Sequence, residues 1–328
     1  MKKIKILISY ILILCLIVIV FPHLPTEAAS DVIEISSVKD LKKISKNLSG
    51  NYILTKDINL KSKTWTPIGT TSAPFTGTFD GNGHTIKKIK TKASKDYQGL
   101  FGFTKDATIK NLKVTGTVKG NLYVGGIVGQ MEGGRIVNCV NNAKIFGVDQ
   151  VGGIVGRISG AIAINCQNNA KVTGTGRCTG GITADLYPSG TIYNCVNLGT
   201  IVGGNDLNGG ISGGSTSGEI ANCVNFGNVT GKGRIGAIAG DNASYAGTRY
   251  FNYFRQTSKI NSAFNAIGTG CYTFSKAKGN LSGTVTIDEK DYQKLIDALN
   301  AGRSALKKET GEELKKWSVY KGKPVLFK

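Results

Sequence analysis

Residues 137–147 read VNCVNNAKIFG, and closely similar segments follow along the chain. They are INCQNNAKVTG at 164–174, YNCVNLGTIVG at 193–203 and ANCVNFGNVTG at 221–231. The cysteines of these segments are separated by 27, 29 and 28 residues. A repeat with this period predicts a solenoid, because one repeat cannot bury its own apolar face and must stack on its neighbours.

Two further patterns keep the same period. The glycine-rich segment VGGIVG occurs at 124–129 and 151–156, and related segments follow at 179–184, 208–213 and 235–240. A β-branched residue also stands six positions after each cysteine position. These residues are Val118, Ile145, Val172, Ile201 and Val229. Each period thus contains three short β-prone patches, which predicts an all-β fold, a right-handed parallel β-helix with three strands and about 28 residues per coil.

The outermost copies of the repeat are less regular. IKNLKVTGTVKG at 109–120 has Leu112 at the cysteine position, and YFNYFRQ at 250–256 is interpreted as a decayed copy with Tyr253 there. Because stacked coils lie about 4.8 Å apart, each position of the repeat should form a column of like side chains. The residues expected in one apolar column of the core are Ile127, Ile154, Ile182, Ile211 and Ile238.

The NC pairs predict two further columns at a bend of the coil. In the asparagine column, which starts at Asn111, the stacked side-chain amides can hydrogen bond from coil to coil. In the cysteine column, the side chains are parallel and in register, a geometry that suits a disulfide poorly. We interpret the cysteines as small buried thiols rather than as metal ligands, and leave the disulfide status of Cys178 and Cys271 open. The ladder residues are Asn138, Cys139, Asn165, Cys166, Asn194, Cys195, Asn222 and Cys223.

The segment FTGTFDGNGHTIKKIK at 75–90 places Asp80 four residues before His84. A catalytic pair would need a nucleophile and a substrate pocket, and the sequence indicates neither. Asp80 and Asn82 are typical of tight turns, and the glycines that flank Asn82 allow positive φ. We therefore predict a structural corner that leads into a strand beginning at Thr85.

The first 28 residues are typical of a secretory signal peptide, with a basic start, an apolar run and small residues up to Ala28. The mature chain would carry 38 basic and 20 acidic residues, and it contains no further segment apolar enough to span a membrane. We expect a secreted, extracellular protein that can associate non-covalently with a cell wall. Its positive charge predicts affinity for polyanions, and no motif indicates nucleic-acid binding.

The order of these segments divides the mature chain into three regions. Residues 29–74 should form an N-terminal cap, 75–275 the β-helix and 276–328 a C-terminal cap of a helix and a strand pair. Such caps hide the open ends of a solenoid.

Both caps contain a predicted helix. The first begins after the N-cap Ser37 and buries Leu41 and Ile44. The second spans about residues 287–300 and ends at Gly302.

The chain resembles secreted β-solenoid proteins that carry the GLUG motif, including the non-catalytic N-terminal region of immunoglobulin-A-protease-like surface proteins. The resemblance rests on VIEISSVKDLKKISKNLSGNYILTKDINL, WTPIG, FTGTFDGNGHTI, QGLFGFTKDATIKNLKVTG, the VGGIVG and NC repeats and WSVYKGKPVLF. It implies a β-solenoid fold and a surface or adhesive role. The metallopeptidase part of the larger relatives has no counterpart in this sequence.

The repeat also predicts charged columns on the outside of the coils. Arg157 should lie beside Asp185, and Asp149, Arg177 and Asp206 should follow one another on consecutive coils. We interpret these columns as ladders of ion pairs. In the alternative, the arginines and aspartates line a groove for an acidic sugar, with the ring of a tyrosine such as Tyr187 stacked on it.

The sequence indicates no catalytic residue, metal site or cofactor, because neither three clustered carboxylates nor a glycosidase-like carboxylate pair stands out. We predict a non-catalytic surface module that binds an anionic polysaccharide or cell-wall polymer. One alternative is a carbohydrate-active β-helix enzyme, a polysaccharide lyase or hydrolase. Another is a toxin-like or assembly component that binds a host surface protein. The ligand and the oligomeric state stay open.

Overall fold

The computed structural model describes residues 31–215, 218–240, 249–250, 252–254, 292–321 and 323–327. The predicted signal peptide and Cys271 lie outside these residues. The described residues from Ile33 onward belong to one compact unit.

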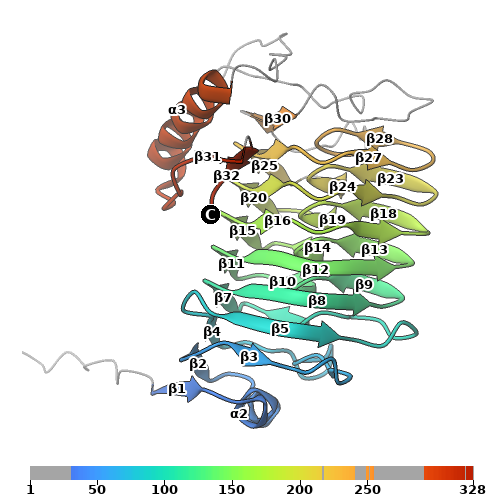
Figure 1. Ribbon diagram of the computed structural model, residues 1–328, viewed down its shortest axis with the longest axis vertical. Coiled ribbons are helices and arrows are strands. Elements are labelled where there is room, and N and C mark those ends of the chain that lie inside the picture. The colour runs from blue at the N-terminus through green and yellow to red at the C-terminus, as the bar shows by residue number, and fades with distance from the viewer. Residues whose placement is uncertain are drawn as a thin grey trace, which may run out of the picture. The chain divides into compact units, whose positions relative to one another are not determined.

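This unit is a stack of parallel coils, as predicted, but each regular coil contributes to four sheets instead of three (Figure 1). One coil runs through β10 (Val128–Glu132), β11 (Arg135–Val137), β12 (Val140–Gly147) and β13 (Asp149–Gly152). We name the sheets that contain these strands C, A, B and D, respectively. The pairing of Ile136 with Ile109 and with Ala163 gives a period of about 27 residues, close to the prediction.

In each regular coil a strand of sheet A is followed, across the corner at the NC pair, by a strand of sheet B. Sheet A contains β1 (Val32–Ile35), β2 (Asn51–Leu54), β4 (Thr78–Asp80), β7 (Thr108–Lys110), β11, β15 (Ile162–Ile164), β20 (Thr191–Tyr193), β25 (Glu219–Ala221) and β29 (Arg249–Tyr250). Sheet B contains β3 (Ile58–Asn59), β5 (Thr85–Lys90), β8 (Lys113–Lys119), β12, β16 (Gln167–Asn168), β17 (Val172–Gly174), β21 (Val196–Asn197), β22 (Ile201–Val202), β26 (Val224–Asn225), β27 (Val229–Thr230) and β30 (Tyr253–Phe254).

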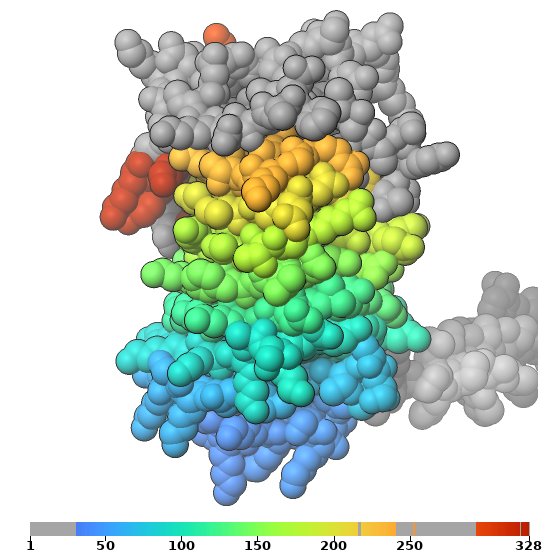
Figure 2. Space-filling view, turned by 90° about the vertical axis from the view of Figure 1, so that its right-hand side faces the viewer, coloured from blue at the N-terminus to red at the C-terminus, as the bar shows by residue number. Residues whose placement is uncertain are grey.

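Sheets C and D pack closely on each other. Sheet C contains β6 (Phe101–Lys105), β10, β14 (Val155–Ser159), β19 (Thr183–Leu186) and β24 (Ser212–Ser215). Sheet D contains β9 (Leu122–Gly125), β13, β18 (Arg177–Gly180), β23 (Asp206–Gly209) and β28 (Ile235–Gly236). Figure 2 shows the coils from the side on which sheet D lies, as successive bands in chain order.

The fourth strand of each coil arises inside the glycine-rich marker. The sequence pattern predicts one β-prone patch at VGGIVG, but in the structure β9 ends at Gly125 and β10 begins at Val128. A side chain at Gly125 would place its Cβ 2.1 Å from the carbonyl oxygen of Val128, so the chain can turn here only at glycine. The marker is therefore the turn between sheets D and C.

The predicted core columns are confirmed. The five isoleucines of the marker and the five β-branched residues that follow the cysteine position are all buried, with exposures of 0 to 3%. Aromatic residues fill the first coils, where the ring of Phe101 packs against Phe75 at 4.9 Å and Phe79 at 5.4 Å between centroids. The core is thus a continuous apolar column whose members are specified by the repeat.

The asparagine ladder is also confirmed. Asn138 donates a hydrogen bond to Asn111, Asn165 to Asn138, Asn194 to Asn165 and Asn222 to Asn194, at 2.7 to 3.0 Å. All five have φ between 53° and 57°, which asparagine tolerates better than most other residues. The ladder therefore fixes a left-handed corner at the same place in every coil.

A second asparagine ladder was not predicted, although its residues are visible in the repeat as the asparagine two positions after each cysteine. In this buried column Asn141 donates to Asn168, Asn168 to Asn197 and Asn197 to Asn225, at 2.8 to 2.9 Å. Each side chain also bonds a backbone carbonyl two residues further on. This ladder satisfies the polar groups of a bend that faces the core.

The cysteine column consists of buried free thiols, as predicted, and Cys178 is also free. Cys195 accepts the backbone N–H of Cys166 at 3.3 Å and donates its thiol hydrogen to the carbonyl of Tyr193 at 3.2 Å. Burial raises the pKa of the Cys139 and Cys195 thiols, because a thiolate has no compensating solvation in the core.

One predicted register was wrong by one residue. Tyr253 pairs with Val224, so Asn252 and not Tyr253 continues the cysteine column. Asn252 is 1% exposed and, like the thiol of Cys195, makes two hydrogen bonds to the preceding coil. It accepts the N–H of Cys223 at 2.9 Å and donates to Ile220 at 2.7 Å. A buried position with these two partners suits a small polar side chain better than a tyrosine.

The N-terminal helix agrees with its prediction. Helix α2 (Val38–Lys43) begins after Ser37, whose hydroxyl accepts the N–H of Asp40 at 3.2 Å, and a short 3-10 turn η1 (Ile44–Lys46) follows. Leu41 and Ile44 are fully buried in the core of the first coils.

The C-terminal helix differs from its prediction in extent and in place. Helix α3 (Tyr292–Thr310) passes Gly302 and ends before Gly311, whose φ of 73° suits a helix terminus. Rather than covering the end of the solenoid, α3 and the antiparallel pair β31 (Ser318–Tyr320) and β32 (Lys323–Val325) lie against the side of the later coils (Figure 1). The outward residues of these coils are apolar, which explains the docking.

Candidate functional site

The structure separates the five predicted site residues into two groups on neighbouring sheets. Arg157 and Asp185 pair across β14 and β19 of sheet C, and Tyr187 follows β19. Arg177 and Asp206 pair across β18 and β23 of sheet D. Both predicted neighbour relationships are confirmed.

Arg157 is held by protein groups on several sides. Its Nε lies 3.7 Å from Asp185 Oδ2, and its guanidinium lies 4.1 Å from the centre of the Tyr187 ring. Its Nη1 donates to the hydroxyl of Tyr123 at 3.3 Å, and the Tyr123 ring stacks on that of Tyr97 at 4.9 Å. The side chains of Arg157 and Asp185 are only 19% and 15% exposed, so this pair links two neighbouring strands of sheet C and is largely shielded from solvent.

The second group depends on a residue that was not predicted. Arg234 donates to both carboxylate oxygens of Asp206, with 3.0 Å from Nε to Oδ1, while Arg177 Nε is 3.8 Å from Oδ2. The hydrogen bonds from Arg234 lower the pKa of Asp206 to about 2. Asp149 accepts the backbone N–H of Arg177. Of the predicted column, Arg177 and Asp206 form an ion pair, whereas Asp149 is joined to Arg177 through the backbone.

Cys178 lies between the two groups and faces Gly214 and the Asp185 carboxylate. Burial raises the pKa of its thiol to about 12, and the neighbouring Asp185 adds to the effect. A thiol with this pKa stays protonated at neutral pH and is a poor nucleophile.

His84 and Asp80 do not contact each other through their side chains. Asp80 accepts the N–H of Asn82 at 2.8 Å and the amide of Asn111 at 3.0 Å, so it closes the corner and starts the first asparagine ladder. His84 Nδ1 lies 3.6 Å from Asp57 Oδ1. The positive φ values at this corner belong to Asn82 and Gly83. The structural corner is confirmed.

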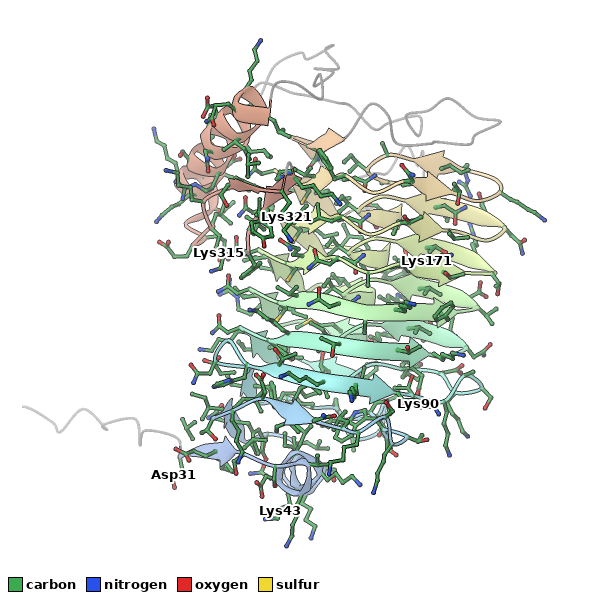
Figure 3. All side chains as sticks on the ribbon, viewed as in Figure 1. Asp31, Lys43, Lys90, Lys171, Lys315 and Lys321 are labelled. Atoms are coloured by element: carbon green, nitrogen blue, oxygen red, sulfur yellow. The ribbon has the colours of Figure 1, made fainter. Side chains whose placement is uncertain are left out.

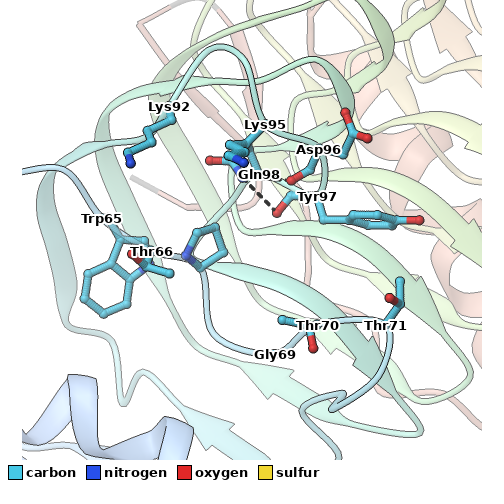
Figure 4. A pocket seen from close by; sticks show the side chains of 11 residues that line it. Trp65, Thr66, Gly69, Thr70, Thr71, Lys92, Lys95, Asp96, Tyr97 and Gln98 are labelled. Carbon is cyan, nitrogen blue, oxygen red and sulfur yellow. Dashed lines mark hydrogen bonds between the residues drawn. The ribbon is translucent and has the colours of Figure 1, made fainter.

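A surface pocket of about 300 Å³ lies beside the first coils (Figure 4). The buried indole of Trp65 forms one wall, and Lys92, Lys95 and Tyr97 line the opening. The ring of Tyr97 also stacks on that of Tyr123, whose hydroxyl binds Arg157, so the pocket borders the group around this arginine. The sequence repeat does not extend to Trp65, so no column of the repeat indicates this pocket.

Lysines gather on the outer face of sheet B, a feature that the sequence analysis missed. Lys90 and Lys144 both pair with Thr117, and Lys171 lies on the next coil after Lys144. Lys90 and Lys171 are labelled on this face in Figure 3. The lysines in the strands of sheet B, with Lys171 immediately before β17, are Lys87, Lys88, Lys90, Lys113, Lys119, Lys144 and Lys171.

No aspartate or glutamate occurs in the described strands of sheet B, and the ion pair of this face is that of Lys87 with Asp57, at 2.7 Å. We call the surface around Lys90, Lys144 and Lys171 the lysine face. Its positive charge is not neutralised by neighbouring strands, in contrast to the arginines of sheets C and D. The signal in the sequence was the lysine of NNAK, which recurs in only two coils.

The residues that the structure describes contain no group of three or more His, Cys, Asp or Glu side chains placed to hold a metal ion. None of their helices has the length and apolar character needed to cross a membrane.

Comparisons with known proteins show similarity in fold. No family model matches the chain. A crystal structure from Bacteroides ovatus, described as a candidate immunoglobulin A1 protease, has a TM-score of 0.68 and 22% identity over 90% of this chain and 92% of its own. A structure named IgA1 protease has a TM-score of 0.51 and 17% identity, and the match covers 68% of this chain and 21% of that one.

One curated protein is similar in sequence. Halomucin of Haloquadratum walsbyi is 29% identical over 143 residues, in a match that covers 30% of this chain and 2% of halomucin. The chain therefore corresponds to a small part of that protein. The structural likenesses establish the β-solenoid fold.

Proposed function

We propose that this protein is a secreted, non-catalytic module of a bacterial surface that binds an anionic polysaccharide or cell-wall polymer through the lysine face. The observation that carries the proposal is the run of exposed lysines on sheet B without an acidic residue in the same strands. Surface charge of one sign attracts a polymer of the opposite sign and concentrates it at that face.

The geometry of the coils supports a linear ligand. Lys90, Lys144 and Lys171 lie on successive or alternate coils, which are spaced about 4.8 Å apart along the stack. A chain with regularly spaced anionic groups that runs along the stack would meet several lysines at once. Each exposed contact contributes little, up to about 1 kcal/mol, so affinity would come from their number.

Secretion and surface location are supported by the signal-like segment at 1–28 and by the resemblance to GLUG-motif proteins. The likenesses to IgA1 proteases and to halomucin fit a surface module. The enzyme alternative receives no specific support from Arg157 and Asp185, because these side chains bind each other and two tyrosines.

The test is co-sedimentation of the chain from Ala29 with insoluble polymers at low and high salt. The panel contains bacterial wall with and without teichoic acid, an acidic polysaccharide, a neutral glucan and DNA-cellulose. We expect pelleting with the anionic polysaccharide or wall polymer that weakens as salt screens the charges, and no sugar released into the supernatant.

A matched pair of variants assigns the binding to the lysine face. The triple variant K90Q/K144Q/K171Q and the control K39Q/K42Q/K308Q each lose three exposed charges, but the control residues lie on the helices. We expect the first variant alone to lose most of its binding. Equal losses would mean that only net charge matters, and released sugar would replace the binding proposal with the enzyme alternative. Salt-insensitive binding to a host protein would favour the third hypothesis.

A further inference from the structure

The C-terminal strand pair forms a second surface with sheet B. A groove of about 380 Å³ lies between β8, β12 and β16 on one side and the β31–β32 pair on the other. Tyr320 and Phe327 contribute aromatic rings to it, and Lys113, Lys321 and Lys323 contribute charge. No aspartate or glutamate is among the residues that line the groove.

The position of the groove follows from a change of character along one outward column of sheet B. Along the chain this column contains Lys113 and Val140, then the buried Gln167, and then Val196 and Val224. The last two residues are covered by α3, Trp317 and Leu326. The groove therefore lies at the boundary between the open lysine face and the part of sheet B that the C-terminal segment covers.

A chain of side-chain amides runs along the floor of the groove. Gln167 accepts the N–H of Leu326 at 3.2 Å and donates to Asn169 at 2.9 Å, and Asn169 donates to Asn142 at 2.8 Å. Every bond in this chain points the same way, so the acceptor oxygen of each amide is used within the protein. The group left at the end is the NH₂ of the exposed Asn142, which is a donor.

The groove thus combines three ammonium groups and an amide donor with an exposed aromatic ring. Tyr320 is 43% exposed, and the Nζ of Lys315 lies 4.7 Å from the centre of the Phe327 ring. Several cationic and amide donors without a carboxylate favour an anionic group, and an exposed aromatic ring offers an apolar face to a sugar or polyol. A volume of this size accommodates a small ligand rather than a polymer domain.

We propose that this groove binds one anionic unit of a glycan or polyol-phosphate chain, with Tyr320 against its carbon skeleton and Lys113, Lys321 and Lys323 around its carboxylate or phosphate. The inference rests on the proposed function, because the unit would belong to the polymer that follows the lysine face. The groove would be a specific subsite that recognises one anionic unit of the polymer.

The experiment uses short soluble probes, so that the groove is measured apart from the lysine face. A galacturonic acid tetramer, a glycerol-phosphate tetramer and a neutral glucose tetramer are titrated into the chain from Ala29 by calorimetry. We expect one or both anionic tetramers to bind at one site at least tenfold more tightly than the neutral one. The anionic probe that binds distinguishes a carboxylate from a phosphate ligand.

The variant K321Q/K323Q should lose at least tenfold in affinity for the bound tetramer, and Y320A a similar amount. K316Q/K308Q, which removes two exposed lysines of the same C-terminal segment outside the groove, should change affinity less than twofold. Unchanged thermal unfolding of each variant shows that the C-terminal segment stays docked. Equal losses in both double variants, or no preference for anionic tetramers, would overturn the inference.

Failure of the two proposals can be told apart. If wild-type protein pellets with an anionic polymer but binds neither anionic tetramer, the proposal for the lysine face is supported and the proposal for the groove is refuted. Protein that binds a tetramer but pellets with no polymer would retain the groove and refute the lysine face as a polymer-binding surface.

Discussion

The indole Nε1 of Trp317 donates a hydrogen bond of 2.6 Å to the side-chain oxygen of Asn194. Asn194 belongs to the first asparagine ladder and receives a second bond from Asn222 at 2.7 Å. Next to it, Lys315 donates its N–H to Asn165 and accepts from Asn194 through its carbonyl. The C-terminal segment is therefore attached along the corner of several coils, and it connects them laterally.

The first prediction concerns this attachment. Trp317→Phe keeps most of the buried ring but removes the donor, so it should lower the free energy of unfolding by about 1 kcal/mol. Trp317→Ala also creates a cavity and should cost about 3–5 kcal/mol. Urea unfolding followed by circular dichroism measures both. Val319→Ala, at a 40% exposed position in the same segment, should be close to neutral.

The ladder itself predicts a difference between two substitutions at Asn165. This side chain bonds Asn138, Asn194, Glu313 and Lys315, and its φ is 53°. Asn165→Ala should cost at least about 3 kcal/mol, because it leaves buried partners unpaired and keeps a left-handed backbone. Asn165→Gly should be less harmful by about 1 kcal/mol, since glycine relieves only the backbone strain. Equal costs in thermal unfolding would contradict a role for φ.

Substitutions at two glycines should distinguish the stability cost of a steric clash from that of a left-handed backbone conformation. A Cβ at Gly152 would lie 1.9 Å from the carbonyl oxygen of Val155, whereas Gly160 has φ of 60° and no heavy atom within 4 Å of the Cβ position. Gly160→Ala should therefore cost about 1 kcal/mol. Gly152→Ala should prevent sheets D and C from packing and cost several times more. Soluble yield and melting temperature of the two variants measure the difference, and similar values would show that the turn can relax.

The Asp206 ion pair predicts a dependence of stability on pH. Its pKa is lowered to about 2 in the folded protein, mainly by Arg234, from an ordinary value of 3.8. Its contribution is therefore fully present above about pH 4 and is lost as the pH falls through about 2, with at most about 2 kcal/mol involved.

Asp206→Asn should remove this part of the acid dependence. Unfolding free energies between pH 7 and pH 2 provide the test, with Asp31→Asn as an exposed control. A wild-type curve parallel to that of Asp206→Asn would show that the ion pair does not contribute.

Much of the coil could be read from local pattern because each position repeats. The columns at Ile127, Cys139 and Asn138 were identified correctly, since a residue that recurs with the period must occupy the same place in each coil. The predicted register was wrong at Tyr253, where the repeat pattern decays. The two hydrogen bonds of Asn252 show that this residue, and not Tyr253, continues the cysteine column. The prediction of three strands per coil was wrong because the glycine pair of each marker forms a turn and not the interior of a strand.

The candidate sites show the same division. Arg157 and Asp185 were placed side by side from spacing alone, but only the structure shows that Tyr123 and Tyr187 engage the arginine. The lysine face and the groove were missed because they combine residues that do not recur in every period. The groove also joins Lys113 to Lys323, which are far apart in sequence.

The sequence by itself determined the stacked parallel coils, the core columns and the ladders, because a periodic chain can satisfy its backbone and bury its apolar side chains only by repeating one local conformation. The tertiary structure alone decided where the C-terminal helix and strand pair lie. Their docking depends on outward residues such as Ile164, Val196 and Tyr193 becoming apolar over several coils at once. No local pattern along the chain encodes that surface, since it exists only after the coils have stacked.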